Sequence, residues 1–113
     1  MPRFVILEHD HPFLHWDLML EAGDVLRTWR LASPPKKGEP INATFLADHR
    51  RLYLDYEGPV SGERGRVVRW DAGVFAWKMD EGDMIEVVLE GTRACGRARL
   101  ARVQGNDWSF TLS

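Results

Sequence analysis

The sequence predicts an all-β domain, a sandwich or a barrel, and three observations indicate this. Turn-forming residues recur about every 8–12 residues, as at Asp10–Pro12, Glu57–Gly65 and Gly105–Asp107. Between the turns lie runs of roughly five to nine residues rich in Val, Leu, Phe, Trp and Tyr, which favour extended backbone. No segment repeats apolar residues at the spacing of an amphipathic helix.

The candidate strands follow these apolar runs in chain order. They are expected near Arg3–His9, Leu14–Glu21, Val25–Ala32, Ala43–Ala47, Arg51–Tyr56, Arg66–Asp71, Val74–Lys78, Met84–Glu90, Arg97–Val103 and Trp108–Leu112. Pro40–Ala47 has room for one helical turn. The stretch Ser33–Pro40, SPPKKGEP, is expected to form one long loop, and such loops often flank functional sites.

The composition indicates a single globular domain over residues 1–113. Hydrophobic residues make up 44% of the chain and charged residues 28%, as in ordinary folded domains. One cysteine, Cys95, excludes an internal disulfide and a zinc knot built on cysteine pairs. No stretch resembles a signal peptide or the roughly 20 apolar residues of a membrane span, so we expect a cytoplasmic protein without membrane contact.

The charge pattern gives no global basic field of the kind that usually accompanies nucleic-acid binding, because the net charge is −2. Arginines nevertheless gather at Arg50–Arg51, within Arg64–Arg69 and within Arg93–Arg102. These groups form either a local basic face or ordinary solvated strand faces. The sequence leaves both interpretations open.

The stretch His9–Glu21, HDHPFLHWDLMLE, concentrates three of the four histidines and two aspartates in an apolar run. Burying such groups is unfavourable unless each finds a partner. On a strand, alternate side chains share a face, so His15, Asp17 and Met19 lie on one side while the intervening apolar residues face the core. The strand therefore combines an apolar face with a face that begins as a polar site.

A turn over Asp10–Phe13 is expected to bring His9 back beside His15. Together with Asp17, these residues offer two imidazoles and one carboxylate, a ligand set that suits Mn²⁺, Fe²⁺ or Zn²⁺ at an open, catalytic site. His11 is a competing ligand, although its place before a proline favours a role in the turn. The alternative is a His–Asp hydrogen bond without any metal.

The fourth histidine lies in a second segment, DHRRLYLDYEG. On a strand, His49, Arg51 and Tyr53 share a face and offer a proton donor, a cation and a hydroxyl. This combination suits an oxyanion such as phosphate. The alternative is an Arg/Tyr alternation on a solvated strand.

The two segments together resemble a known family. RFVILEHDHPFLHWDLMLEAGDVLRTW, followed by LADHRRLYLDYEG and GRVVRWDAG, is similar to the 3′-phosphoesterase domain of bacterial DNA ligase D and its stand-alone relatives. The shared marks are a His with His-x-Asp six residues later, a Leu-Glu and turn before Leu-x-x-Trp, an Asp-His-x-x-x-Tyr, and a Glu-Gly before Trp-Asp-x-Gly. The resemblance covers nearly the whole chain.

The resemblance implies a compact, closed or nearly closed β-barrel of about eight antiparallel strands with at most short helical turns. It implies a divalent-metal-dependent enzyme that trims DNA 3′ ends during non-homologous end joining, removing a terminal ribonucleoside and then the 3′-phosphate. The implied metal is Mn²⁺, with Zn²⁺ as the alternative. The implied partners are nucleic-acid 3′ ends and a separate ligase or polymerase.

By motif position, the resemblance assigns metal binding to His9, His15 and Asp17. It assigns the phosphate contacts to His49 and Tyr53. The family pattern continues as His-x-Asp-x-Arg, and the position of that phosphate-clamping arginine is Met19 here. Three further positions also depart from the family: Ala47 stands for a glutamate, and Ser33 and Ile41 for basic residues.

The resemblance therefore keeps the metal half of the site and loses much of the anion-binding half. Loss of one electrostatic donor reduces transition-state stabilisation by several kcal/mol, on the order of 3. The candidate substitutes are nearby basic residues: Arg51, which we assign to substrate binding, and Arg64, Arg66, Lys36 and Lys37.

Three functions follow from these observations. The first is a metal-dependent phosphoesterase acting on nucleic-acid 3′ ends. The second is a metal-bound module that grips such ends with weak or no catalysis, because Met19 supplies no charge. The third is a small-molecule phosphoesterase on the same scaffold.

Overall fold

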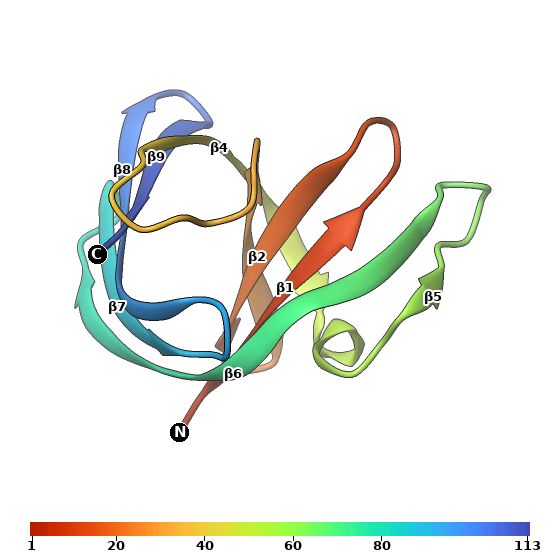
Figure 1. The fold of residues 1–113 in the computed structure, drawn as a ribbon, viewed down its shortest axis with the longest axis horizontal. Coiled ribbons are helices and arrows are strands. Elements are labelled where there is room, and N and C mark those ends of the chain that lie inside the picture. The colour runs from red at the N-terminus through yellow and green to blue at the C-terminus, as the bar shows by residue number, and fades with distance from the viewer.

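Nine β-strands and one short 3₁₀ helix, η1, make up the computed structural model, which describes all residues 1–113 (Figure 1). The elements are β1 (Arg3–His9), β2 (His15–Ala22), β3 (Val25–Leu31), β4 (Ile41–Arg50), η1 (Arg51–Leu54), β5 (Gly58–Pro59), β6 (Arg66–Asp80), β7 (Met84–Glu90), β8 (Cys95–Gln104) and β9 (Asp107–Leu112). The structure contains no helix that is long and apolar enough to cross a membrane.

The strands form one closed antiparallel barrel. Their order is β1-β2-β3-β4-β9-β8-β7-β6, and β6 pairs back onto β1, which closes the ring of eight strands. The two-residue β5 extends the sheet beyond β6 (Figure 1). The predicted all-β barrel of about eight antiparallel strands is therefore confirmed.

Two apolar clusters lie on opposite faces of β1 and β2. The inner core fills the barrel with 18 buried residues, among them Phe4, Leu18 and Trp29. A second group, which we call the outer cluster, packs outside the barrel between β1–β2–β3 and the η1–β6 connection. It consists of Val5, Leu7, Met19, Leu26, Leu54 and Val67. In Figure 1 the barrel lies on one side of β1 and β2, and the β5 segment lies on the other.

Burial on both faces explains why β1 and β2 have continuous apolar sequences. In β1, Phe4 to Leu7 are all buried, and in β2 the same holds for Asp17 to Leu20. By contrast, β8 alternates buried Ala98 and Leu100 with exposed residues, as expected of a strand with one solvated face. The outer covering of β1–β2 is thus a local addition to the barrel.

Two local predictions around β4 are wrong. Pro40–Ala47 forms no helical turn, because β4 runs from Ile41 to Arg50. The predicted strand Arg51–Tyr56 instead begins with η1 over Arg51–Leu54. The helical turn reverses the chain, so that Leu54 reaches the outer cluster and is 2% exposed.

The predicted break at Asp71–Gly73 is also wrong, since β6 is continuous from Arg66 to Asp80. Asp71 does not form a turn here: its carboxylate accepts the backbone N–H groups of Thr92, Arg93 and Ala94, at 2.7–3.0 Å. Gly73 allows close packing, because a Cβ there would lie 2.2 Å from the carbonyl oxygen of Glu90. Asp71 and Gly73 therefore contact residues that are distant in the sequence, and neither forms a turn.

Candidate metal and phosphate site

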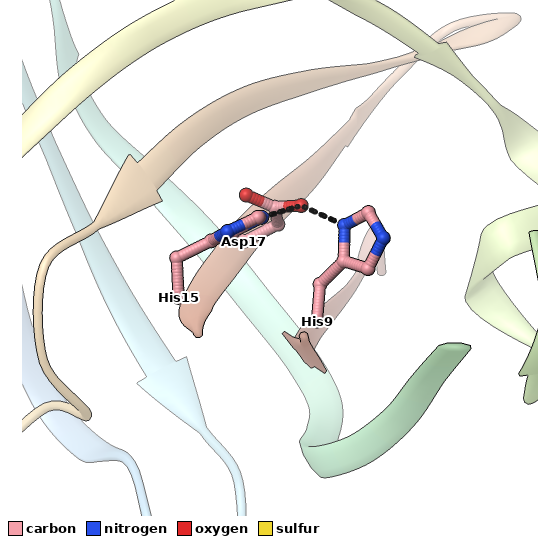
Figure 2. A group of neighbouring side chains, drawn as sticks. All are labelled: His9, His15 and Asp17. Carbon is pink, nitrogen blue, oxygen red and sulfur yellow. Dashed lines mark hydrogen bonds and ion pairs between the residues drawn. The ribbon is translucent and has the colours of Figure 1, made fainter. Parts of the chain in front are cut away.

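The β1–β2 hairpin brings the candidate metal ligands together. His9 and His15 are direct partners in the antiparallel register, and their ring centroids lie 4.9 Å apart. Asp17 follows two residues after His15 on the same outer face, as the strand alternation predicts (Figure 2). One ligand atom from each of the three residues lies within 4.8 Å of the others.

The Asp17 carboxylate lies between the two imidazoles. Its Oδ2 is 3.2 Å from His15 Nε2 and 3.9 Å from His9 Nδ1, the contacts dashed in Figure 2. His15 is fully buried and Asp17 is 3% exposed. The second carboxylate oxygen, Oδ1, is buried and accepts no hydrogen bond. A buried carboxylate with an unpartnered oxygen is unfavourable unless a cation compensates it.

Backbone contacts orient both histidine rings. The His15 Nδ1 lies 2.8 Å from the carbonyl oxygen of Phe13. Because a carbonyl oxygen only accepts, Nδ1 is the protonated nitrogen, and the lone pair of the neutral ring is on Nε2, facing Asp17. Two acceptors 3.2 Å apart repel each other unless a proton or a metal ion lies between them.

The other ring is oriented in the same way. His9 Nε2 donates to the carbonyl oxygen of Arg64 at 2.8 Å, so the His9 lone pair is on Nδ1 and also faces Asp17. This contact requires the turn before β6 to approach the hairpin closely. Gly65 makes this possible: its φ is +76°, and a Cβ there would lie 2.1 Å from a carboxylate oxygen of Asp10.

The three residues therefore fit a divalent metal ion. Each histidine donates its other ring N–H to a carbonyl, the outer hydrogen bond that usually accompanies a metal-binding histidine. Ligand atoms sharing an ion at about 2.1 Å lie about 3.0–3.5 Å apart, so only small side-chain movements separate this arrangement from a ligand shell. Two imidazoles and one carboxylate leave positions open for substrate or water.

A cavity of about 430 Å³ opens beside these residues, on the outer face of β1–β3. The size falls within the range of small-ligand sites. Its lining residues come from β1 to β4, β6, η1 and the β1–β2 and β5–β6 turns: His9, His11, Pro12, Asp17, Met19, Arg30, Ala47, Asp48, His49, Arg50, Tyr53, Val60, Arg64 and Val67. Three arginines and two aspartates line it, so the cavity is more positive than the chain as a whole.

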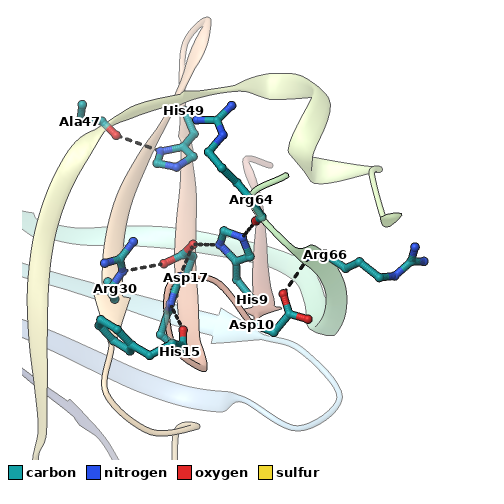
Figure 3. Close-up of polar contacts among 10 residues, drawn as sticks. His9, Asp10, His15, Asp17, Arg30, Ala47, His49, Arg64 and Arg66 are labelled. Atoms are coloured by element: carbon teal, nitrogen blue, oxygen red, sulfur yellow. Dashed lines mark hydrogen bonds and ion pairs between the residues drawn. The ribbon is translucent and has the colours of Figure 1, made fainter. Parts of the chain in front are cut away.

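His49 and Tyr53 both line this cavity, but not because they alternate along a strand. His49 is the last residue but one of β4 and Tyr53 lies in η1, with their ring centroids 5.9 Å apart in an edge-to-face arrangement. His49 Nδ1 donates to the carbonyl oxygen of Ala47 at 2.9 Å, as Figure 3 shows. Its Nε2 is therefore the nitrogen left for a ligand.

The structure does not bring Arg51 to the cavity. The helical turn of η1 directs its guanidinium to Glu21, with which it forms an ion pair. A hydrogen bond from the Arg3 backbone N–H and the Arg51 contacts together hold the pKa of Glu21 below its usual value. The expected shared face of His49, Arg51 and Tyr53 is therefore wrong, because it assumed a strand where the chain is helical.

Among the other proposed basic substitutes, Arg64 lines the cavity, whereas Arg66, Lys36 and Lys37 do not. The Arg64 guanidinium is engaged within its own turn: Nε donates to the Ser61 carbonyl oxygen at 2.7 Å, and Nη2 lies 3.2 Å from the Ser61 hydroxyl. His11 lines the cavity but lies outside the group of candidate metal ligands.

Met19 is both a cavity residue and a member of the outer cluster. It is 1% exposed and packs among apolar side chains, on the same face as His15 and Asp17. A thioether there supplies no charge and no hydrogen-bond donor. The position that the resemblance gives to an arginine is therefore part of the apolar floor of the cavity.

Three charged residues that the sequence does not mark as site residues, Arg30, Asp48 and Arg50, also line the cavity. Arg30 has the clearest signal: in LRTWRL it alternates with Trp29, whose side chain is in the inner core, so it had to face outward. Its proximity to Asp17 depends on the β2–β3 register, in which the two residues are direct partners. That register is not readable from β3 alone.

Comparisons with known proteins identify the family of this chain. The profile of the DNA ligase D 3′-phosphoesterase domain matches residues 7–102. The multifunctional non-homologous end joining DNA repair protein LigD of Mycobacterium tuberculosis (strain ATCC 25618 / H37Rv) is 34% identical over 114 residues, covering 93% of this chain. The LigD of Mycolicibacterium smegmatis is 31% identical over 94% of the chain, and that of Pseudomonas aeruginosa is 28% identical over 88%.

This chain spans 13–16% of the length of these relatives. The identity therefore concerns one part of each relative. The family profile matches β1 from Leu7 onward, β2 to β7 and most of β8. On the profile match and the identity over most of its length, the chain belongs to the DNA ligase D 3′-phosphoesterase domain family.

Proposed function

We propose that this chain is a metal-dependent phosphoesterase that processes DNA 3′ ends, removing a 3′-phosphate and a terminal ribonucleoside. One observation carries the proposal. His9 and Asp17, two of the three candidate metal ligands, line one cavity with His49 and Tyr53, although the two pairs lie more than thirty positions apart in the chain. Membership of the family supports a role in DNA end processing.

His9, His15 and Asp17 would hold a divalent cation, with Mn²⁺ as our first choice and Zn²⁺ as the alternative, and the bound ion would supply positive charge for phosphoryl oxygens and for a water molecule. Asp17 contributes the negative charge that makes the site favourable for a dication. The Phe13 and Arg64 carbonyl contacts keep both imidazole lone pairs directed at the same point. The ligand set is thus preorganised by backbone contacts.

His49 and Tyr53 act on the phosphate. In removal of a 3′-phosphate, the bond between phosphorus and the 3′ oxygen breaks, water supplies the new hydroxyl on phosphorus, and the 3′ oxygen leaves with a proton; in removal of a terminal ribonucleoside, the bond to the nucleoside oxygen breaks instead, and that oxygen leaves with the proton. His49 provides that proton from Nε2 in its imidazolium form, since its Nδ1 proton is held by Ala47. Tyr53 donates a hydrogen bond to a non-bridging phosphate oxygen.

We propose that this domain works with enzymes that ligate DNA ends or extend them by synthesis. The relatives are described as multifunctional end joining proteins, and this chain matches 13–16% of their length. We propose that a ligase or a polymerase, on another polypeptide or on another part of a longer chain, uses the 3′-hydroxyl ends that this domain produces.

A direct assay tests the proposed function. Metal content is measured on the purified chain, which is then incubated with Mn²⁺ and labelled duplexes ending in a 3′-phosphate, a 3′-ribonucleotide or a 3′-hydroxyl. We expect the first two to be converted and the third to persist. Asp17→Ala should remove both bound metal and turnover; if this variant retains both, the assignment of the metal site is wrong.

The second candidate is a binding module, and the apolar environment of Met19 favours it. In that case phosphate-ended duplexes bind with a steep salt dependence but are not converted. A small-molecule phosphoesterase is distinguished in the same assay, because it would hydrolyse a simple phosphomonoester and leave every duplex intact.

A further inference from the structure

Arg30 is the cation closest to the candidate metal ligands. It is the direct β-sheet partner of Asp17, and its Nε lies 3.9 Å from Asp17 Oδ1. That separation is too long for a hydrogen bond. Figure 3 shows Arg30 on one side of the Asp17 carboxylate and His9 on the other, so the two carboxylate oxygens face different partners.

The Arg30 guanidinium makes no hydrogen bond, unlike the guanidinium groups of Arg51 and Arg64. Its Nε is buried and donates no hydrogen bond, and its charge lies 5.6 Å from the centre of the Phe13 ring. Arg64, by contrast, is bonded to Ser61, and Arg51 to Glu21. Arg50 is exposed, whereas the Arg30 side chain is only 28% exposed. A partly desolvated, unbonded guanidinium is well suited to bind an incoming anion.

We propose that Arg30 binds a phosphate oxygen of the substrate, the role that the resemblance gives to an arginine at position 19. This rests on the proposed phosphoesterase function and names the residue that supplies its missing cation. The cation comes from β3 and not from β2, beside Asp17 and within the cavity that His49 and Tyr53 also line. The ligand class is a terminal phosphomonoester dianion.

The positive charge of Arg30 has opposite effects on the binding of metal and of phosphate. Its positive charge lies close to Asp17, so it opposes the binding of a dication there. The same charge attracts phosphate. Replacing Arg30 by an uncharged residue should therefore weaken phosphate binding while leaving metal affinity equal or higher. A purely structural role would instead lower both affinities together with the melting temperature.

The experiment compares the wild type with Arg30→Gln, Arg30→Lys and the control Arg97→Gln. Arg97 forms an exposed ion pair with Glu86 on β7–β8 and does not line the cavity. Titration calorimetry measures Mn²⁺ binding, then the binding of inorganic phosphate to the Mn²⁺-loaded protein. We expect Arg30→Gln to weaken phosphate binding at least tenfold, Arg30→Lys to be intermediate, and Arg97→Gln to match the wild type.

A relocation variant and a turnover assay complete the test. Met19→Arg combined with Arg30→Met returns the cation to β2 and should recover part of the lost phosphate affinity. Equal phosphate binding by wild type and Arg30→Gln overturns the inference even if the wild type is active, as does a parallel loss of metal and phosphate binding. A wild type that binds phosphate through Arg30 but converts no 3′ end overturns the proposed function alone.

Discussion

The inner and outer faces of β2 are equally buried but differ in what their burial accomplishes. Leu18 belongs to the inner core, and Asp17, its neighbour in the chain, faces the cavity; they are 0% and 3% exposed. Burying leucine stabilises the fold, whereas burying a carboxylate with an unpartnered oxygen opposes it. The contrast indicates that the inner face maintains the barrel and that the outer face is arranged for a ligand.

Leu18→Ala tests whether the inner face of β2 contributes to stability without contributing to ligand binding. Removing a fully buried leucine leaves a cavity in the inner core, so the free energy of unfolding should fall by about 2–5 kcal/mol. Chemical denaturation with and without Mn²⁺ measures the change. The Mn²⁺ affinity of the molecules that remain folded should not change; an affinity loss comparable to the stability loss would contradict a separation of the two faces.

The neighbouring substitution Asp17→Asn should behave in the opposite way. Without metal, the neutral amide removes an unfavourable buried charge, so the unfolding free energy in EDTA should equal or exceed that of the wild type. Metal binding to the native state stabilises by about 2.7 kcal/mol at one hundred times the dissociation constant, and this gain should be lost. A Mn²⁺-induced rise in melting temperature equal to that of the wild type would contradict the assignment of Asp17.

Two neighbouring tyrosines test the outer face at finer scale. Tyr53 lines the cavity, while Tyr56 packs edge-to-face against it and donates its hydroxyl to the Pro59 carbonyl oxygen. One lost hydrogen bond to a phosphate oxygen corresponds to about 1.4 kcal/mol, so Tyr53→Phe should reduce kcat/KM roughly tenfold. Tyr56→Phe should leave kcat/KM unchanged. Equal losses in both variants would mean that the hydroxyls act only through packing.

The same contrast shows which parts of the molecule the sequence could predict. The period of two along a strand placed His15, Asp17 and Met19 on one face, and a short turn returned His9 to His15. These are local relations that need no knowledge of the rest of the fold. The resemblance to the family added His49 and Tyr53, and both line the cavity.

What could not be predicted depends on contacts between distant segments. Arg51 turns away because four residues adopt a 3₁₀ helix to bury Leu54 against β1 and β2. Arg30 reaches Asp17 only through the β2–β3 register. Asp71 resembles a turn residue because its true partners, the N–H groups near Thr92, lie more than twenty residues away. In each case tertiary contacts decided between local alternatives.

The smallest expected effect concerns Glu21, at the end of β2 farthest from the metal ligands. The Arg3 backbone N–H and then Arg51 hold the pKa of Glu21 below its usual value of 4.5. A lowered folded-state pKa contributes stability that is present above the unfolded pKa and is lost as pH falls through the folded value. Glu21→Gln should therefore lower the unfolding free energy at pH 7 by no more than about 1 kcal/mol, and the difference should shrink below about pH 5.

Denaturation midpoints of wild type and Glu21→Gln between pH 3 and pH 7 measure this difference, with Glu39→Gln as the control. Glu39 forms only an exposed ion pair with Lys36, so its replacement should give a small difference at every pH. Parallel profiles for wild type and Glu21→Gln would mean that the Arg3 contact does not persist in solution. Turnover at pH 7 should be unaffected, because Glu21 lies outside the cavity and its contacts serve the outer surface of the barrel.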